Sequence, residues 1–261
     1  MSFMFIDTHA HLYLDQFNED SSEVIRRAKE EGVQSIFLPN IDVSTISSMN
    51  DLRLAHPDFC YSMIGLHPCS VKEDYKAQLD HMKSELETSP YHGIGETGID
   101  LYWDSTYKSE QIESFECQID WAKDKNLPII IHSRNALELT IDIIGQHQDG
   151  TLRGIFHCFN GTVAQCRQIA DMGFMMGLGG VITYKKAALD EMVKYMPIEH
   201  MLLETDAPYL SPVPFRGKRN ESGYLKYIAD KVAVIREATV AEVATFTTKN
   251  AQTLFHSNVL T

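Results

Sequence analysis

The sequence predicts a single-domain α/β protein with the closed (β/α)8 architecture of a TIM barrel, spanning residues 1–261. Short apolar runs alternate with amphipathic stretches about eight times, a pattern that gives parallel strands joined by right-handed crossovers. The length of 261 residues suits one such barrel, and no linker, repeat or low-complexity tract divides the chain. A doubly wound open sheet is the main alternative.

The apolar runs are short enough to be buried strands. They are Phe3–Ile6, Val33–Leu38, Phe59–Leu66, Gly93–Glu96, Pro128–Ile131, Gly154–Phe156, Phe174–Leu178 and Met201–Glu204. The stretches between and after them place apolar residues at helical spacing. They predict helices over Ser21–Glu31, Ser44–Ala55, Lys72–Glu87, Ser105–Lys125, Ala136–Gln146, Val163–Met172, Lys186–Tyr195, Ser222–Arg236 and Val240–Phe255. Two helix starts have the spacing of a capping box, at Asp20 with Glu23 and at Thr239 with Glu242.

The composition is that of an ordinary globular protein, with 44% hydrophobic and 23% charged residues. No apolar run approaches the roughly 18–20 residues of a membrane span, and the start does not resemble a signal peptide, so we expect a cytoplasmic protein without membrane contact. The five cysteines include no Cys-x-x-Cys pair and are expected to be free, buried or half-buried thiols. The net charge of −13 is unlike that of proteins that coat nucleic acid, so any such contact must be local. Nothing points to an obligate protein partner.

The motif Asp7-Thr8-His9-Ala10-His11 follows the first predicted strand. Side chains alternate along extended backbone, so His9 and His11 share a face and can chelate one cation. Two ordinary histidines, one in the core and one exposed, are the alternative. Asp7 lies on the face of His9 and is expected to orient an imidazole from outside the ligand shell.

Other potential metal ligands follow the later apolar runs. They are His67, Glu96, His132, His157, Glu204 and Asp206. In a parallel barrel the carboxyl ends of all strands open on one face, where active sites lie. Taken singly, a buried histidine bonded to backbone, or an aspartate that starts a turn, would explain each position. Their shared placement instead predicts a metal site, and imidazole with carboxylate suits zinc and other divalent ions.

Six of these side chains, four histidines with Glu96 and Asp206, are predicted to be metal ligands. Six exceed the need of one tetrahedral site and suit two divalent ions, Mg, Mn or Zn, that share a bridging ligand. The assignment is His9, His11 and Asp206 on one ion, His132 and His157 on the other, and Glu96 as the bridge. A bridging water would lose its proton and become the nucleophile. Glu96 and Asp206 are therefore the predicted catalytic residues, with Asp206 taking the proton.

Residues around these ligands carry further expectations. Gly93, Gly95 and Gly98 are expected to leave Glu96 little cover, as suits a closely approached ligand. Glu204 shares a face with Asp206 and is expected either outside the ligand shell or in the barrel interior. The remaining histidines are expected to be structural or exposed, namely His56, His81, His92, His147, His200 and His256.

The densest basic run, Phe215-Arg216-Gly217-Lys218-Arg219-Asn220, follows the last predicted strand. Arg216 and Arg219 are expected at the mouth of the barrel, where guanidinium groups can grip phosphates. Arg134, two residues after His132, is expected to join them. A solvated loop is the alternative.

Seven motifs, in order along the chain, together resemble the TatD family of metal-dependent deoxyribonucleases. They are Ile6–Leu12, Gly65–Pro68, Gly93–Asp100, Ile131–Arg134, Phe156–Phe159, Leu203–Leu210 and Arg216–Asn220. The resemblance implies a TIM-barrel hydrolase related to the amidohydrolases, with metal held at positions matching His9, His11, Glu96, His132, His157 and Asp206. It also implies cleavage of DNA phosphodiesters, commonly from the 3′ end of single strands, with His67 contacting substrate. Ser222 stands where the family usually has proline, which predicts a slightly looser loop start.

Three functions are weighed. The leading one is a metal-dependent phosphodiesterase, a 3′–5′ exonuclease on single-stranded DNA that contacts the phosphate backbone or the 3′ end. The same site would also serve a small-molecule amide, lactone or ester hydrolase, which the acidic charge fits at least as well. The third is a non-catalytic, metal-stabilised scaffold. The basic run distinguishes the first two, because only cleavage of a polyanion requires it in a salt-dependent way.

Overall fold

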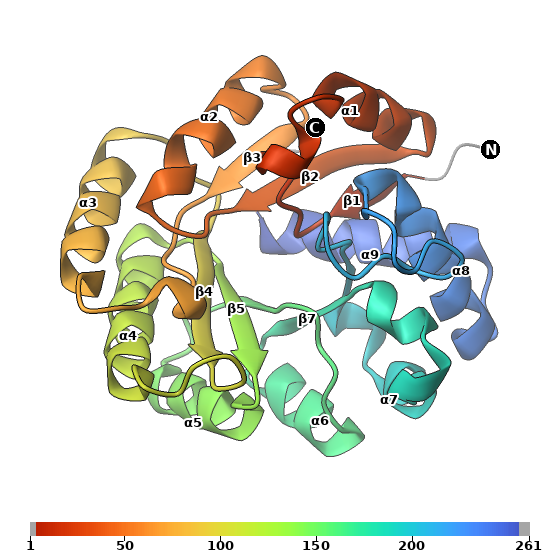
Figure 1. The fold of residues 1–261 in the computed structure, drawn as a ribbon. Coiled ribbons are helices and arrows are strands. Elements are labelled where there is room, and N and C mark those ends of the chain that lie inside the picture. The colour runs from red at the N-terminus through yellow and green to blue at the C-terminus, as the bar shows by residue number, and fades with distance from the viewer. Residues whose placement is uncertain (1–3, 256–261) are drawn as a thin grey trace.

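The computed structural model describes residues 4–255, so Phe3 of the first predicted strand and His256 lie outside the described residues. Parallel strands form a ring at the centre of the molecule, with helices around it (Figure 1). The strands are β1 (Phe5–Asp7), β2 (Val33–Pro39), β3 (Cys60–Met63), β4 (Ile94–Asp100), β5 (Ile129–Arg134), β6 (Gly154–Phe156), β7 (Met175–Leu178) and β8 (Met201–Leu203).

Each strand hydrogen-bonds to its sequence neighbour in two sheets, β1 to β3 and β4 to β8. Parallel bridges between Ile64 and Ile94, and between Ala10 and Ala207, join the two sheets just beyond β3 and β1. A backbone hydrogen bond of 3.2 Å from Thr8 N to Leu203 O adds to the second junction. The ring therefore closes, which confirms the predicted (β/α)8 barrel over the open sheet.

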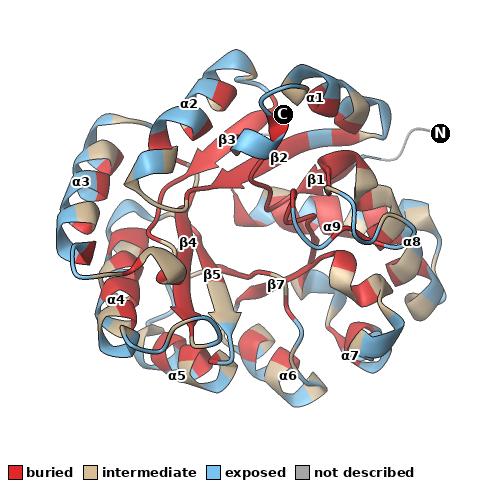
Figure 2. Ribbon diagram, in the orientation of Figure 1, coloured by how far each residue is buried: buried red, intermediate tan, exposed pale blue. Residues whose placement is uncertain are grey.

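Helices surround the ring and bury one face each against it (Figure 2). The α-helices are α1 (Ser21–Glu30), α2 (Ile46–Ala55), α3 (Tyr75–Thr88), α4 (Lys108–Lys125), α5 (Leu137–His147), α6 (Val163–Asp171), α7 (Asp190–Tyr195), α8 (Leu225–Arg236) and α9 (Val240–Leu254). Short 3-10 turns lie at Asp15–Phe17, Val43–Thr45, Pro68–Ser70, Gly180–Thr183, Lys185–Ala187, Ile198–His200 and Ser222–Tyr224.

Two local predictions at helix starts are wrong. The Asp20 side chain makes no capping hydrogen bond to α1 and pairs with Arg219 instead, because a guanidinium offers a stronger, charge-assisted partner. The helix predicted over Lys186–Tyr195 is interrupted at Ala188, which has a left-handed φ of 52° and therefore ends the preceding 3-10 turn. The second predicted capping box, at Thr239 and Glu242, is confirmed.

The barrel interior is filled by apolar side chains from every strand except β4. Helix α9 crosses the amino ends of the strands, where Thr248 Oγ1 donates to Met4 O at 2.8 Å and Asn250 Nδ2 donates to Met201 O at 2.9 Å. The ring of Phe255, at the end of α9, stacks on Phe37 with centroids 3.6 Å apart. The amino end of the barrel is thereby plugged, which leaves the carboxyl end for polar side chains.

All five cysteines are free, Cys60 and Cys166 buried and the others half-buried, as predicted. Within residues 4–255, no helix combines the length and the apolar character needed to cross a membrane.

Candidate metal centre

Two histidines just after β1 begin the site. The backbone there is tied to the segment after β8 by hydrogen bonds from His11 N to Ala207 O (2.7 Å) and from Asp206 N to His9 O (2.9 Å). The Nε2 atoms of His9 and His11 lie 3.2 Å apart, and both side chains are buried. Two imidazole nitrogens therefore face one point inside the protein.

One carboxylate oxygen of Glu96 faces the same point. Glu96 Oε2 lies 3.1 Å from His9 Nε2 and 3.4 Å from His11 Nε2. Asp206 Oδ1 lies 3.8 Å and 3.6 Å from those two nitrogens. Two ligands of one ion, each bonded at about 2.1 Å, are themselves roughly 3–3.5 Å apart. These four side chains have the spacing to hold one divalent ion.

The other oxygen of Glu96 faces a second group of histidines. Glu96 Oε1 lies 2.8 Å from His157 Nε2, 2.9 Å from His132 Nδ1 and 3.4 Å from His67 Nε2. His132 Nδ1 and His157 Nε2 are 3.3 Å apart. The six side chains that the sequence predicts as ligands therefore meet around one carboxylate, and His67 lies beside them.

The chemistry of this cluster fits divalent cations. Two facing Nε2 atoms can share at most one proton, and His9 Nδ1 is buried without a hydrogen-bond partner among residues 4–255. Buried polar groups need partners, and imidazole nitrogen with carboxylate oxygen is a donor set that such ions take. Three overlapping trios of side chains have ligand atoms within 4.8 Å of one another, namely His9/His11/Asp206, His9/Glu96/His157 and His67/Glu96/His132.

Two histidines are held from behind by polar side chains that sequence reasoning did not assign to the site. Asp100 Oδ2 lies 2.9 Å from His132 Nε2, and Tyr13 Oη lies 2.9 Å from His11 Nδ1. Such contacts fix the ring orientation and leave the opposite nitrogen free to bind a metal. Asp100 follows Glu96 by four residues in β4, so the alternation of side chains along a strand could have placed it on the face of Glu96. Tyr13 lies in the turn after His11, where no such alternation applies.

Glu204 supports His157, consistent with its predicted place outside the ligand shell. Its Oε1 accepts a hydrogen bond from Cys158 N at 2.6 Å and lies 3.3 Å from His157 Nδ1. Glu204 is fully buried, and Gly177 makes room for it, because a Cβ there would lie 1.9 Å from Glu204 Oε2. The carboxylate therefore occupies a space that any side chain at position 177 would fill.

Asp7 bonds to two backbone N–H groups and a threonine hydroxyl and not to an imidazole, which corrects the expectation for it. Its Oδ1 accepts from His9 N at 3.3 Å and from Thr205 N at 2.9 Å, and its Oδ2 accepts from Thr205 Oγ1 at 2.6 Å. Burial raises the pKa of Asp7 to about 7, against the lowering effect of these hydrogen bonds. Asp7 thus joins the two segments that carry His9 and Asp206.

The glycines around Glu96 do not leave it open, which corrects a second expectation. Glu96 is only 2% exposed. A Cβ at Gly98 would lie 2.1 Å from His132 O, and one at Gly95 would lie 2.7 Å from Ile130 Cβ, where φ is also +155°. These glycines allow β4 to pack closely on β5, and that close packing brings Glu96 and His132 together.

Burial and neighbouring charges shift the pKa values of the two carboxyl groups in opposite directions. Burial raises the pKa of Asp206 to about 6, against the pull of the nearby histidines. Burial also acts to raise the pKa of Glu96, but the surrounding histidines, His157 and His67 above all, hold it well below its ordinary value. Glu96 is therefore the fixed negative charge of the cluster.

Asp206 is held in an uncommon backbone conformation. Its φ of 57° lies in the left-handed region, which non-glycine residues adopt at a cost on the order of 1–3 kcal/mol. The hydrogen bond to His9 O and one from Tyr209 N to Asp206 O at 2.8 Å hold it there. Such strained residues cluster at functional sites, where the surrounding fold fixes a side chain's direction.

The arginines predicted to bind substrate have different surroundings. Arg134 and Arg216 are exposed and lie over aromatic rings, with Arg134 Cζ 3.8 Å from the Tyr102 centroid and Arg216 Cζ 4.5 Å from that of Tyr184. Arg219 instead forms a two-pronged ion pair with Asp20, with nitrogen–oxygen distances of 2.8 and 2.6 Å.

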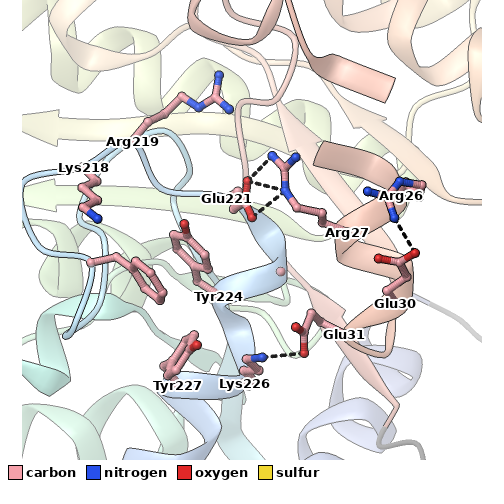
Figure 3. Close-up of a pocket in the computed structure, with 12 residues that line it drawn as sticks. Arg26, Arg27, Glu30, Glu31, Lys218, Arg219, Glu221, Tyr224, Lys226 and Tyr227 are labelled. Atoms are coloured by element: carbon pink, nitrogen blue, oxygen red, sulfur yellow. Dashed lines mark hydrogen bonds and ion pairs between the residues drawn. The ribbon is translucent and has the colours of Figure 1, made fainter. Parts of the chain in front are cut away.

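Figure 3 shows a pocket of about 650 Å³ between α1, the basic run and α8. None of its lining residues belongs to the six predicted ligands. Most of its cations are paired within the protein: Glu221 accepts from Arg27 at 2.6 Å, and Lys226 Nζ lies 2.6 Å from Glu31 Oε2. Ion pairs therefore cross this pocket between α1 and the segment at α8, and they leave few of its cations free to bind an anion.

The end of the basic run and the loop start at Ser222 are well anchored. Asn220 Nδ2 donates to Thr205 O and to Tyr209 O, both at 2.7 Å, and Asn220 and Ser222 are fully buried.

The histidines expected to be structural or exposed lie outside the ligand trios within residues 4–255. They are His56, His81, His92, His147 and His200.

Comparisons with known proteins agree with this geometry. A family described as TatD related DNase matches residues 6–256. An uncharacterized metal-dependent hydrolase, YabD of Bacillus subtilis, is 41% identical over 98% of this chain and 100% of its own. The 3′-5′ ssDNA/RNA exonuclease TatD of Erwinia tasmaniensis is 30% identical over 96% of this chain and 99% of its own. The solved structure of YJJV, a TatD homologue from Escherichia coli, is similar with a TM-score of 0.91 and 28% identity, covering 98% of this chain and 99% of that one.

Proposed function

We propose that this protein removes nucleotides from the 3′ end of single-stranded DNA. The chain belongs to the TatD-related DNase family and is a metal-dependent hydrolase acting on ester bonds. A relative over nearly the whole chain is named as an exonuclease of single-stranded DNA and RNA, which supports this choice of substrate. The cytoplasmic location and the absence of an obligate protein partner stay predictions.

Two divalent ions would occupy the cluster around Glu96. His9, His11 and Asp206 would hold one, His132 and His157 the other, and Glu96 would bridge them. The observation that carries this assignment is that Oε2 of Glu96 faces the first set while its Oε1 faces the second. When bound, divalent ions supply positive charge that polarises a phosphodiester and eases the deprotonation of water.

The side chains of this chain supply the remaining functions. Asp206 would orient the attacking water and accept its proton, since its carboxylate lies at the edge of the cluster and its backbone is fixed. Glu96 would stay ionised throughout. Asp100 would keep the proton of His132 on Nε2, so that Nδ1 stays directed at the cluster.

The substrate would enter over His67 and the exposed arginines. His67 Nδ1 accepts from Cys69 N at 3.0 Å, which directs its Nε2 toward Glu96 and the scissile region. Arg134 and Arg216 are exposed and lie over aromatic rings, so their positive charges are available to phosphates. Arg219 was predicted for the same role, but its pairing with Asp20 favours a supporting one.

The test is an assay of the metal-loaded protein on single-stranded DNA labelled at either end, with Mg²⁺, Mn²⁺ or Zn²⁺. A 5′-labelled strand should shorten progressively, whereas a 3′-labelled strand should release its label at once. RNA, duplex DNA and a small amide, lactone and ester are assayed in parallel. The proposal is wrong if a well-metallated protein leaves every nucleic acid intact and hydrolyses one of the small substrates.

A further inference from the structure

The turn after β4 carries two exposed aromatic rings beside the cluster. Tyr102 is 51% exposed and Trp103 is 69% exposed. Their ring centroids are 4.9 Å apart and the rings are nearly perpendicular, at 85°. The turn therefore presents aromatic surface of both residues to solvent.

A cation lies over the same rings. The guanidinium carbon of Arg134 is 3.8 Å from the centroid of Tyr102 and 5.2 Å from that of Trp103. Arg134 is exposed, so its charge is open to an incoming anion. Stacking on the rings restrains the side chain without neutralising it.

The rings are tied to the metal centre through Asp100. One oxygen, Oδ1, accepts hydrogen bonds from Tyr102 N at 2.9 Å and Trp103 N at 3.2 Å. The other, Oδ2, lies 2.9 Å from His132 Nε2. The backbone of Asp100 also lies opposite that of Arg134 in the β4–β5 register. One buried carboxylate thus fixes the turn and a predicted ligand relative to each other.

We propose that Tyr102, Trp103 and Arg134 form a stacking surface that binds the nucleobases of a single-stranded substrate, next to the bond that is cut. This inference rests on the proposed function. Aromatic rings combined with arginine bind single strands of any sequence, because every base has a π-face. Because the net charge of the chain is −13, electrostatic attraction of a polyanion has to be local, and stacking adds affinity that does not depend on charge.

Trp103 provides both the variant and the readout. The metal-loaded protein is titrated with oligothymidylate whose linkages are phosphorothioate, so that cleavage is slow, and with an abasic strand of equal length and charge. Binding is followed by anisotropy of a label on the strand and by tryptophan fluorescence. Trp121, the other tryptophan, is 3% exposed, so quenching by bases reports on Trp103.

The Trp103→Ala variant should bind the thymidylate about tenfold or more weakly than the wild type, while Trp103→Phe keeps most of the affinity. For the abasic strand the two proteins should bind alike. Tyr195→Ala is the matched control, because Tyr195 is 52% exposed at the end of α7, on the side where β8 begins, opposite the cluster. It should bind as the wild type does.

The binding results distinguish failure of the stacking surface from failure of the proposed function. If the wild type binds thymidylate and abasic strands equally, or if Trp103→Ala binds thymidylate as tightly as Tyr195→Ala does, the stacking surface is refuted while the exonuclease proposal stands. If the wild type binds neither strand and cleaves no nucleic acid, the proposed function fails and this inference fails with it. Repeating the titration with oligouridylate shows whether the surface accepts RNA bases as well.

Discussion

At the floor of the site, formed by Glu96 and the histidines around it, each side chain is at least partly buried and lies within bonding distance of another member. On the rim, formed by Tyr102, Trp103, Arg134 and Arg216, the side chains are exposed, and the two arginines lie over aromatic rings, Arg134 over Tyr102 and Arg216 over Tyr184. A densely bonded floor fixes geometry to fractions of an ångström, as metal chemistry requires, whereas an exposed rim adapts to a flexible strand. Changes at the floor should therefore affect the rate of catalysis, and changes at the rim should affect affinity.

The largest effect is expected at the floor. His132→Ala and Asp206→Ala should each reduce DNA cleavage by about a thousandfold or more, because each removes a proposed ligand and, at Asp206, the proton acceptor. Cleavage rates and bound metal, measured by elemental analysis, check this. His81→Ala on the exposed face of α3 is the control and should leave both unchanged. Near-normal cleavage by the Asp206 variant would remove it from the mechanism.

A smaller loss is expected one layer behind the ligands. Asp100→Asn places an amide donor where an acceptor faces His132 Nε2, so the imidazole shifts its proton to Nδ1 and loses its metal-binding nitrogen. We expect metal affinity and cleavage to fall by about 10- to 100-fold. The comparison is with Asp51→Asn, an exposed position in α2. Equal metal binding by the two variants would contradict the positioning role of Asp100.

At the rim, Arg134→Ala should act on affinity. We expect KM for single-stranded DNA to rise about five- to tenfold with a much smaller change in kcat, because the phosphate contact forms before and during the reaction alike. The slope of log affinity against log salt concentration should fall by roughly one. Arg167→Ala, exposed on α6, is the control. A fall in kcat with unchanged KM would place Arg134 at the floor instead.

The smallest effect is expected at Arg219, which pairs with Asp20 and for which we propose a supporting role. Arg219→Ala should lower the free energy of unfolding by about 0.5–1 kcal/mol, as for a partly exposed ion pair, and leave KM nearly unchanged. The bond to Arg219 lowers the pKa of Asp20 below its ordinary value of 3.8. The difference in stability should therefore be full above about pH 4 and vanish as the pH falls through the lowered pKa. Urea unfolding at pH 7 and pH 3 measures both, and a large rise in KM would restore Arg219 to the substrate site.

The sequence was sufficient for the architecture and for the side chains that meet at the floor. Alternating apolar runs specify parallel strands, and ligand types at their carboxyl ends specify one shared face, so His9 and Asp206 could be brought together from opposite ends of the chain. Two details around Glu96 could not be predicted from the sequence. The strand continues to Asp100 through glycines, and the glycines serve close backbone packing on β5, which only tertiary contacts reveal.

The rim was the less predictable region. A run of basic residues does not show which of its side chains forms an ion pair with a carboxylate. Asp20 has the spacing of a helix cap, yet it pairs with Arg219 some 200 positions later. Nothing in the sequence connects Tyr102 and Trp103 with Arg134, which the structure places over their rings. Long-range pairing of exposed side chains leaves no periodic signal in the sequence.

The central claim is that Glu96 joins two ions through its two oxygens. Anomalous scattering from a crystal of the wild-type protein soaked in Mn²⁺ tests it directly. The account predicts two peaks, one against His9, His11 and Asp206 and one against His132 and His157, with a different oxygen of Glu96 bonded to each. A single peak, or two peaks that share no carboxylate, would contradict it.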